Sequence, residues 1–273
     1  MSGRSTQLAA AGFGAALLLT LGAGCGPRRP VGPAAPAGPM PSAVTLSSAL
    51  QNLRATRTGL RALARVSYVE TDSHGSARQV VLAERPDRLR LEVLSPLGTV
   101  FALTADDGAL AVYLRSESAV YRGRATRANL EQFAHVDLSV PDAVALLLGT
   151  PPLRAGRNDV VSFDPNEGAT ELWRHIDRGA QVIWFDAALL PVATEERDDG
   201  GHVLWRARFA DFDAERAQMP RHIQIELPAE GRRVALDLQE VEVNPVLETS
   251  LFNLVTPSGV KNIPLAEGVG AGS

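Results

Sequence analysis

The segment from Arg88 to Leu103 constrains the fold most strongly, because apolar and charged side chains alternate along its first half. Leucine or valine at positions 89, 91 and 93 is interleaved with arginine or glutamate at 88, 90 and 92. A period of two residues is typical of a β-strand with one buried and one solvated face. Ser-Pro-Leu-Gly at 95–98 then favours a turn, since proline fixes φ and glycine permits a positive φ. We therefore predict a β-hairpin with Leu97 at its tip.

Leu97 has two interpretations from the sequence alone. A leucine at a hairpin tip has few neighbours in its own chain, although single exposed apolar residues are common on soluble proteins. Its side chain either folds back onto the core or enters an apolar phase outside the protein.

The same alternation recurs in the second half of the chain, most clearly in 203–211, 221–227 and 232–243. Asp-Asp-Gly at 106–108 and Asp-Asp-Gly-Gly at 198–201 are typical of hairpin turns. Short connections favour antiparallel neighbours, and an open sheet of about eleven strands tends to curl. The predicted fold class is mainly β with a few helices (α+β), a curved antiparallel half-barrel with helices at its mouth. A closed sandwich or barrel with an ordinary core stays the alternative.

Three helices are predicted, over 44–61, 126–134 and 140–148. Ser42 and Ser139 are the expected N-caps of the first and the last, because a serine hydroxyl accepts a hydrogen bond from the first helical turn. The last helix is apolar almost all round, so we expect it to be buried on more than one side.

Residues 1–24 are predicted to be a lipoprotein signal peptide. Arg4 precedes an apolar run at 8–21, shorter than the roughly 20 residues that a spanning helix needs. Cys25, the only cysteine, follows three small residues. This placement resembles the bacterial lipobox, in which the cysteine is acylated with chains such as palmitate, although Gly22 stands where that pattern has leucine. An ordinary signal peptide with an incidental thiol is the alternative.

The next segment, 25–43, is predicted to be the lipidated cysteine and an extended tether. Its prolines recur at every third position from 27 to 39, which matches the three-residue turn of polyproline II. The folded domain is predicted over 44–265, with a disordered tail at 266–273. Glycine rather than aspartate follows Cys25, and the resemblance to enterobacterial sorting signals implies the outer membrane.

Composition and motifs argue against several function classes. A formal net charge of -4 disfavours nucleic-acid binding, which needs clustered positive charge. The five histidines form no zinc pattern, and the sequence has no nucleophile elbow, phosphate loop or dinucleotide fingerprint. The paired aspartates precede glycines and fit turn chemistry better than acid/base chemistry. We therefore expect no enzyme activity, no metal and no cofactor. A hydrolase whose catalytic groups converge from distant segments stays a third alternative.

Several motifs follow one another at spacings that resemble the LolA/LolB superfamily of periplasmic lipoprotein carriers and receptors, and LolB-like proteins in particular. They are Leu-Glu-Val-Leu-Ser-Pro-Leu-Gly at 91–98, Asp-Asp-Gly at 106–108, Tyr121, Leu-Leu-Leu-Gly-Thr-Pro at 146–151 and Asn-Pro at 244–245. The resemblance implies an eleven-stranded half-barrel whose helical lid covers a hydrophobic cavity. It also implies that Pro96, Leu97 and Gly98 form a membrane-insertion loop.

The function implied by the resemblance is that of a monomeric, lipid-anchored protein of the outer membrane, facing the periplasm. Acting as a chaperone, it would accept acylated lipoproteins from a LolA-like periplasmic carrier and insert them in the outer membrane. Its ligands would be acyl chains of lipoproteins or phospholipid. The residues expected to line the acyl-chain cavity are Leu91, Val93, Phe101, Leu103, Trp205 and Ile225. The alternative is a LolB-like envelope scaffold with no transfer activity.

Overall fold

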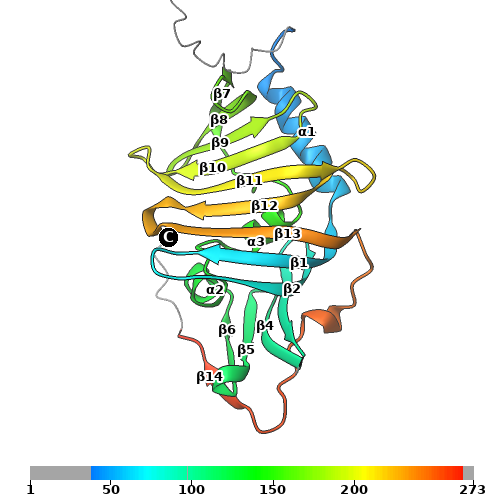
Figure 1. Ribbon diagram of the computed structural model, residues 1–273. Coiled ribbons are helices and arrows are strands. Elements are labelled where there is room, and N and C mark those ends of the chain that lie inside the picture. Colours follow the sequence, from blue (N-terminus) through cyan, green and yellow to red (C-terminus); the bar gives the residue numbers. More distant parts are fainter. Residues whose placement is uncertain (1–37, 97, 267–273) are drawn as a thin grey trace, which may run out of the picture. The chain divides into compact units, whose positions relative to one another are not determined.

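A curved sheet of fourteen strands organises the domain in this computed structural model, which describes residues 38–96 and 98–266 (Figure 1). Every pairing in it is antiparallel except that of β14 with β6, which is parallel. The order across the sheet is β14-β6-β5-β4-β3-β2-β1-β13-β12-β11-β10-β9-β8-β7. Two meanders, β1–β6 and β7–β13, are therefore joined side by side through the β1–β13 pair.

The strands of the first meander are β1 (Gly59–Val69), β2 (His74–Glu84), β3 (Arg88–Ser95), β4 (Gly98–Asp106), β5 (Ala109–Leu114) and β6 (Ala119–Arg124). Those of the second are β7 (Arg157–Asp164), β8 (Ala169–Ile176), β9 (Gly179–Phe185), β10 (Pro191–Arg197), β11 (Val203–Asp213), β12 (Met219–Leu227) and β13 (Arg232–Val243), and β14 is Lys261–Pro264. The helices are α1 (Ala43–Thr56), α2 (Arg127–Ala134) and α3 (Val140–Leu147). The predicted α+β fold class is confirmed.

One face of the sheet, here called the inner face, holds the main hydrophobic core. The alternating apolar positions of both meanders point to it, and α2 and α3, which connect β6 to β7, pack against it with Leu130, Val144 and Leu146. Pro141 is the only exposed residue of α3, which confirms that this helix is buried on several sides. Ser139 caps it as predicted, because its hydroxyl accepts from the Asp142 amide.

The predicted turns are confirmed where the structure describes them. Gly98 has φ +99°, and the Ser95 hydroxyl donates to the Gly98 carbonyl at 2.9 Å. Asp107 and Gly108 both have positive φ, as a two-residue hairpin turn requires. Leu97, Cys25, the signal peptide and most of the tether lie outside the described residues.

The first predicted helix was too long. Ser42 caps α1 as expected, but the helix ends at Thr56 rather than at residue 61, and Gly59 begins β1. The reason is a side chain far away in the sequence. Asn244 accepts hydrogen bonds from the Thr58 and Gly59 amides at 2.8 and 3.1 Å and donates to the Thr56 carbonyl at 2.8 Å.

The strand count was also too low, since the sheet has fourteen strands rather than about eleven. Most predicted strands are present but longer at one end, and β14 was missed. The chain reaches β14 by crossing the outer face, where Leu247 and Phe252 pack on Leu82. Arg122 then donates to the Leu254 carbonyl at 2.6 Å, which places the segment before β14 beside the edge strand β6.

Candidate functional site: an apolar cavity under α2 and α3

A cavity of about 410 Å3 lies between the inner face of the sheet and the α2–α3 segment. This volume is within the range of small-molecule binding sites in proteins. Most of its lining side chains are apolar, and they come from β1, β2, β3, β4, β12, β13 and α2–α3: Val66, Ala77, Leu89, Leu91, Val93, Phe101, Leu130, Phe133, Ala134, Val136, Leu138, Ala143, Leu147, Ile225, Val234 and Leu236. The remaining lining residues are Gly75 and the polar Tyr68, Ser76, Gln79 and His135.

Small residues keep this part of the inner face open. Gly75 and Ala77 of β2, with Ala134 and Ala143 from the α2–α3 segment, leave space that larger side chains would fill. At Gly75 the Tyr68 ring occupies the space where a side chain would begin, since a Cβ there would lie 2.6 Å from this ring. Glycine therefore lets the Tyr68 ring lie flat across β2 at one side of the cavity.

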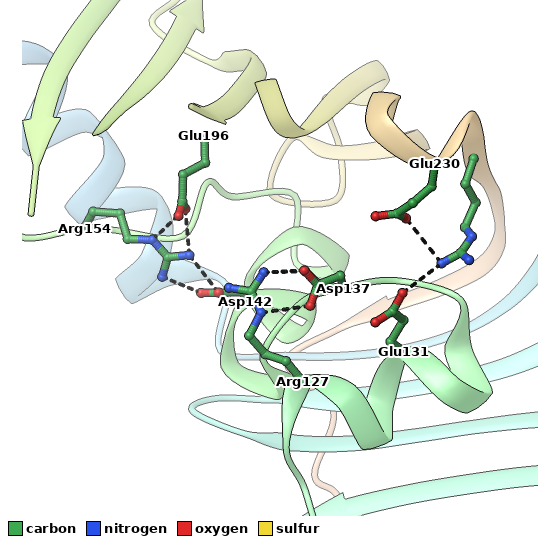
Figure 2. A network of polar contacts seen from close by, with 8 residues as sticks. Arg127, Glu131, Asp137, Asp142, Arg154, Glu196 and Glu230 are labelled. Carbon is green, nitrogen blue, oxygen red and sulfur yellow. Dashed lines mark hydrogen bonds and ion pairs between the residues drawn. The ribbon is translucent and has the colours of Figure 1, made fainter. Parts of the chain in front are cut away.

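Charged side chains surround the Tyr68 end of the cavity. The Tyr68 and His135 rings are stacked with centroids 5.9 Å apart, and His135 Nδ1 is 3.3 Å from the Glu70 carboxylate. Arg232 lies 2.9 Å from Glu70 and also within 3.5 Å of Glu131 and Glu230; Figure 2 shows the two latter carboxylates. Burial and the nearby Glu131 raise the pKa of Glu230, although Arg232 opposes this change. An apolar interior thus meets a polar rim.

A network of ion pairs attaches α3 to the sheet on the side away from Tyr68. Figure 2 shows Arg154 between Asp142 of α3 and Glu196 of β10, and its guanidinium is 2.8 Å from the first and 2.9 Å from the second. Burial opposes the charge of Arg154, but hydrogen bonds and the charges of both carboxylates raise its pKa overall. Arg127 pairs with Asp137 beside this network. The α2–α3 segment is therefore held to the sheet by directional polar contacts.

The C-terminal end of α3 is fixed by a buried arginine. Arg57 is completely buried, and its guanidinium donates to the carbonyls of Leu148, Gly149, Ala217 and Gln218 at 2.7 to 3.3 Å. Burial lowers its pKa to about 10. Since the last carbonyls of a helix have no intrahelical partner, Arg57 satisfies groups that would otherwise stay unpaired. It joins the end of α1 to the end of α3.

Two features are absent from the part of the chain that the structure describes. Within 38–96 and 98–266, no group of three or more histidine, cysteine, aspartate or glutamate side chains is placed to hold a metal ion. None of the helices in that part of the chain combines the length and the apolar character that crossing a membrane requires.

Comparison with known proteins tests the architecture. No protein-family model and no curated protein matches the sequence. A domain from Vibrio parahaemolyticus, described as an outer membrane lipoprotein-sorting protein domain, matches with a TM-score of 0.52 at 16% identity, over 76% of this chain and 95% of that one. A DUF1329 family protein from Desulfovibrio piger has a TM-score of 0.51 at 17% identity, over 76% and 94%. This chain shares the fold of these two proteins.

A LolA superfamily protein from Nitrosomonas europaea also matches, at 16% identity with a TM-score of 0.49, over 78% of this chain and 99% of that one. The curved sheet with helices over one face, which the LolA/LolB resemblance implies, is confirmed by the strand order and by the first two matches. A specific relation to LolB stays a prediction.

All six residues predicted for the acyl-chain cavity belong to the inner face of the sheet. Four of them line the cavity: Leu91, Val93, Phe101 and Ile225. Leu103 and Trp205 do not line it, since both are buried in the core around it. The Trp205 indole N–H has no hydrogen-bond partner among the described residues.

The sequence prediction missed several lining residues. Tyr68 and Gln79 were overlooked, as were all those from the α2–α3 segment. Their signal in the sequence is weak, because a polar or small residue in an alternating strand does not reveal which face it occupies until the register is known. The β1–β2 register pairs Tyr68 with Gly75 and Ala64 with Gln79, which puts all four on the inner face.

Proposed function

We propose that this chain is an envelope lipoprotein that binds acyl chains, accepts acylated lipoproteins from a periplasmic carrier and inserts them in the outer membrane. The observation that supports the proposal most is the apolar cavity with a charged rim, covered by α2 and α3. Acyl chains need such a site, since a sixteen-carbon chain gains roughly 12 kcal/mol on leaving water at about 0.8 kcal/mol per CH₂.

Leu89, Leu91, Val93 and Phe101 would contact the acyl chain along β3 and β4. The charged rim formed by Glu70, His135 and Arg232 would face the headgroup or peptide of the ligand. A triacylated anchor has about three times the hydrocarbon of one chain, so α2 and α3 would have to move outward to admit all of it. Their attachment to the sheet by polar contacts is compatible with such movement, because hydrogen bonds and ion pairs can re-form with water.

The proposal also assigns the membrane anchor and the loop that delivers the cargo. Acylated Cys25 would anchor the protein, with the proline-rich segment as a spacer. Pro96, Leu97 and Gly98 would form the loop that enters the membrane. The side chain of Leu94, next to this turn, is half exposed, which adds a second apolar group at this end of the hairpin.

The binding step is tested by mass spectrometry of organic extracts from residues 26–273, exported to the periplasm behind a cleavable leader so that the protein has no acyl group of its own. We expect co-purified phospholipid or acylated peptide. Ala77→Phe fills the cavity and should remove most of it. Ala210→Phe is the matched control, since Ala210 is exposed on β11, and it should retain the ligand. A ligand-free wild-type domain with full thermal stability would contradict the proposal and favour the scaffold alternative.

The insertion step is tested by following an acylated cargo peptide from a carrier protein to liposomes. Leu97→Glu should slow delivery several-fold without loss of lipid binding, because a charged tip enters hydrocarbon poorly. Val160→Glu on the far edge strand β7, where Val160 is 54% exposed, is the control and should leave delivery unchanged. Equal delivery by both variants would contradict the role of the loop.

A further inference from the structure

Gln79 is a polar residue deep in an otherwise apolar wall. It lies in the middle of β2, where it pairs with Ala64 of β1 and Val93 of β3. Only 8% of its surface is exposed, and it lines the cavity. No hydrogen bond joins its side-chain amide to another described residue, and the amide is not among the fully enclosed unpaired groups, so it is accessible from the cavity.

Such a group is unusual in a protein interior. The large majority of buried polar side chains are hydrogen-bonded, and an amide that faces an apolar space without a partner is unfavourable. Binding pockets are the common exception, because they combine apolar walls with a few polar groups that orient the ligand. The position of Gln79 therefore points to a polar atom of a ligand.

The depth of Gln79 indicates which part of the ligand it meets. Gly75 and Ser76 stand at the charged rim, and Gln79 is three or four residues further along β2, about 10 to 13 Å at the rise of a strand. Beyond it, the lining from Leu89, Leu91 and Leu147 is entirely apolar. A headgroup at the rim and a chain against these leucines place the linkage between them near Gln79.

We propose that Gln79 donates a hydrogen bond to the carbonyl oxygen of the ester or amide that joins an acyl chain to its headgroup. The cavity then selects acylated ligands over hydrocarbon chains joined through ethers. This inference rests on the proposed lipid-binding function and adds the chemical class that the site recognises. A phospholipid ester and the N-terminal anchor of a lipoprotein both offer such a carbonyl.

The test compares matched ligands by native mass spectrometry of the full-length chain in a non-ionic detergent. The probes are dipalmitoyl phosphatidylethanolamine, its dihexadecyl ether analogue and a triacylated cysteinyl peptide. Wild type should bind the ester about threefold to tenfold more tightly than the ether, which corresponds to one net hydrogen bond. Gln79→Met, similar in shape but without the amide, should bind both equally. Gln224→Met, the same change at a residue of β12 that bonds Glu226, should keep the preference.

Each result has a defined meaning. Equal binding of ester and ether by the wild type, or a preference that survives in Gln79→Met, would overturn the inference and leave the proposed function standing. No binding of any of the three probes to wild type would instead overturn the proposed function. Where the preference is lost in Gln79→Met, a larger loss for the peptide than for the phospholipid identifies the lipoprotein anchor as the ligand, and the reverse identifies phospholipid.

Discussion

The inner face of the sheet has two regions that are covered differently. Over β8 and β9, α1 inserts Leu46 and Leu50 against Leu172, Ile183 and Phe185, and all five side chains are completely buried. Over the first meander and β12–β13, the shorter α2 and α3 leave a cavity of about 410 Å3. Both regions have the same alternating strands. The difference shows that alternation fixes which face is apolar, whereas the covering helix and the size of the strand residues decide whether that face is filled.

The largest effect is expected at the network between the two regions. Arg154→Met leaves Asp142 and Glu196 without their partner, and their side chains are only 9% and 13% exposed. Breaking a buried ion pair in this way costs about 3 to 5 kcal/mol, measured as the free energy of unfolding in urea. The control is Arg61→Met, which removes an exposed pair with Glu242 and should cost less than about 1 kcal/mol. Equal losses would show that the network does not join the regions.

The second prediction compares the same truncation in the filled and the hollow region. Leu50→Ala creates a new cavity under α1 and should cost about 3 kcal/mol. Leu91→Ala enlarges a cavity that already exists and removes a partly exposed side chain, so it should cost about 1.5 kcal/mol, the low end for a leucine side chain. Urea unfolding of both variants gives the two values. A Leu91→Ala loss as large as that of Leu50→Ala would mean that the cavity is packed in solution.

A third, smaller effect concerns the junction between α1 and β1. Asn244→Ala removes four hydrogen bonds to residues 56–59 and places alanine at φ +55°, a conformation that favours asparagine or glycine. We expect a loss of about 1 to 2 kcal/mol. Asn244→Gly keeps the backbone conformation and should recover part of it. Thermal unfolding that is identical for all three proteins would contradict the assigned role.

The smallest effect is expected at the ion pair between Arg208 and Glu167 on the outer face of the filled region, and it depends on pH. Hydrogen bonds from Arg208 lower the pKa of Glu167 below its ordinary value. A carboxylate of this kind stabilises the fold above its unfolded pKa of about 4.3, and the contribution is lost as the pH falls through the lower folded value. Arg208→Met should therefore cost about 0.5 kcal/mol at pH 6, and the difference from wild type should shrink towards pH 3. A difference that is constant with pH would exclude this pair as its source.

Local patterns predicted the strands well but not the places where distant residues intervene. The hairpin at 88–103 follows from its own alternation and turn residues. The end of α1 does not, because Asn244 sets it from 186 residues away. Strand β14 was missed because four residues are too short to show a period, and its pairing with β6 is helped by a hydrogen bond from Arg122 to Leu254.

Only part of the cavity could be predicted, because local alternation shows which face a residue occupies but not which distant residues lie next to it. Alternation places Leu91, Phe101 and Ile225 on the inner face, and they line the cavity. It places Leu103 and Trp205 there too, yet these are packed in solid core. Whether an inner-face residue meets a cavity or a neighbour depends on the summed volumes of strands and helices, which no single segment reveals.

Photo-crosslinking tests the proposed acyl-chain site, with a phospholipid that has a diazirine at the end of one acyl chain. Bound to the domain of residues 26–273, the probe should label peptides from β3–β4 and from the α2–α3 segment, where Leu89, Leu91 and Leu147 line the cavity. Addition of unlabelled phospholipid should remove the labelling. Labelling confined to α1 and β7–β9, or labelling that excess phospholipid does not reduce, would contradict the proposal that one half of the inner face is an acyl-chain site.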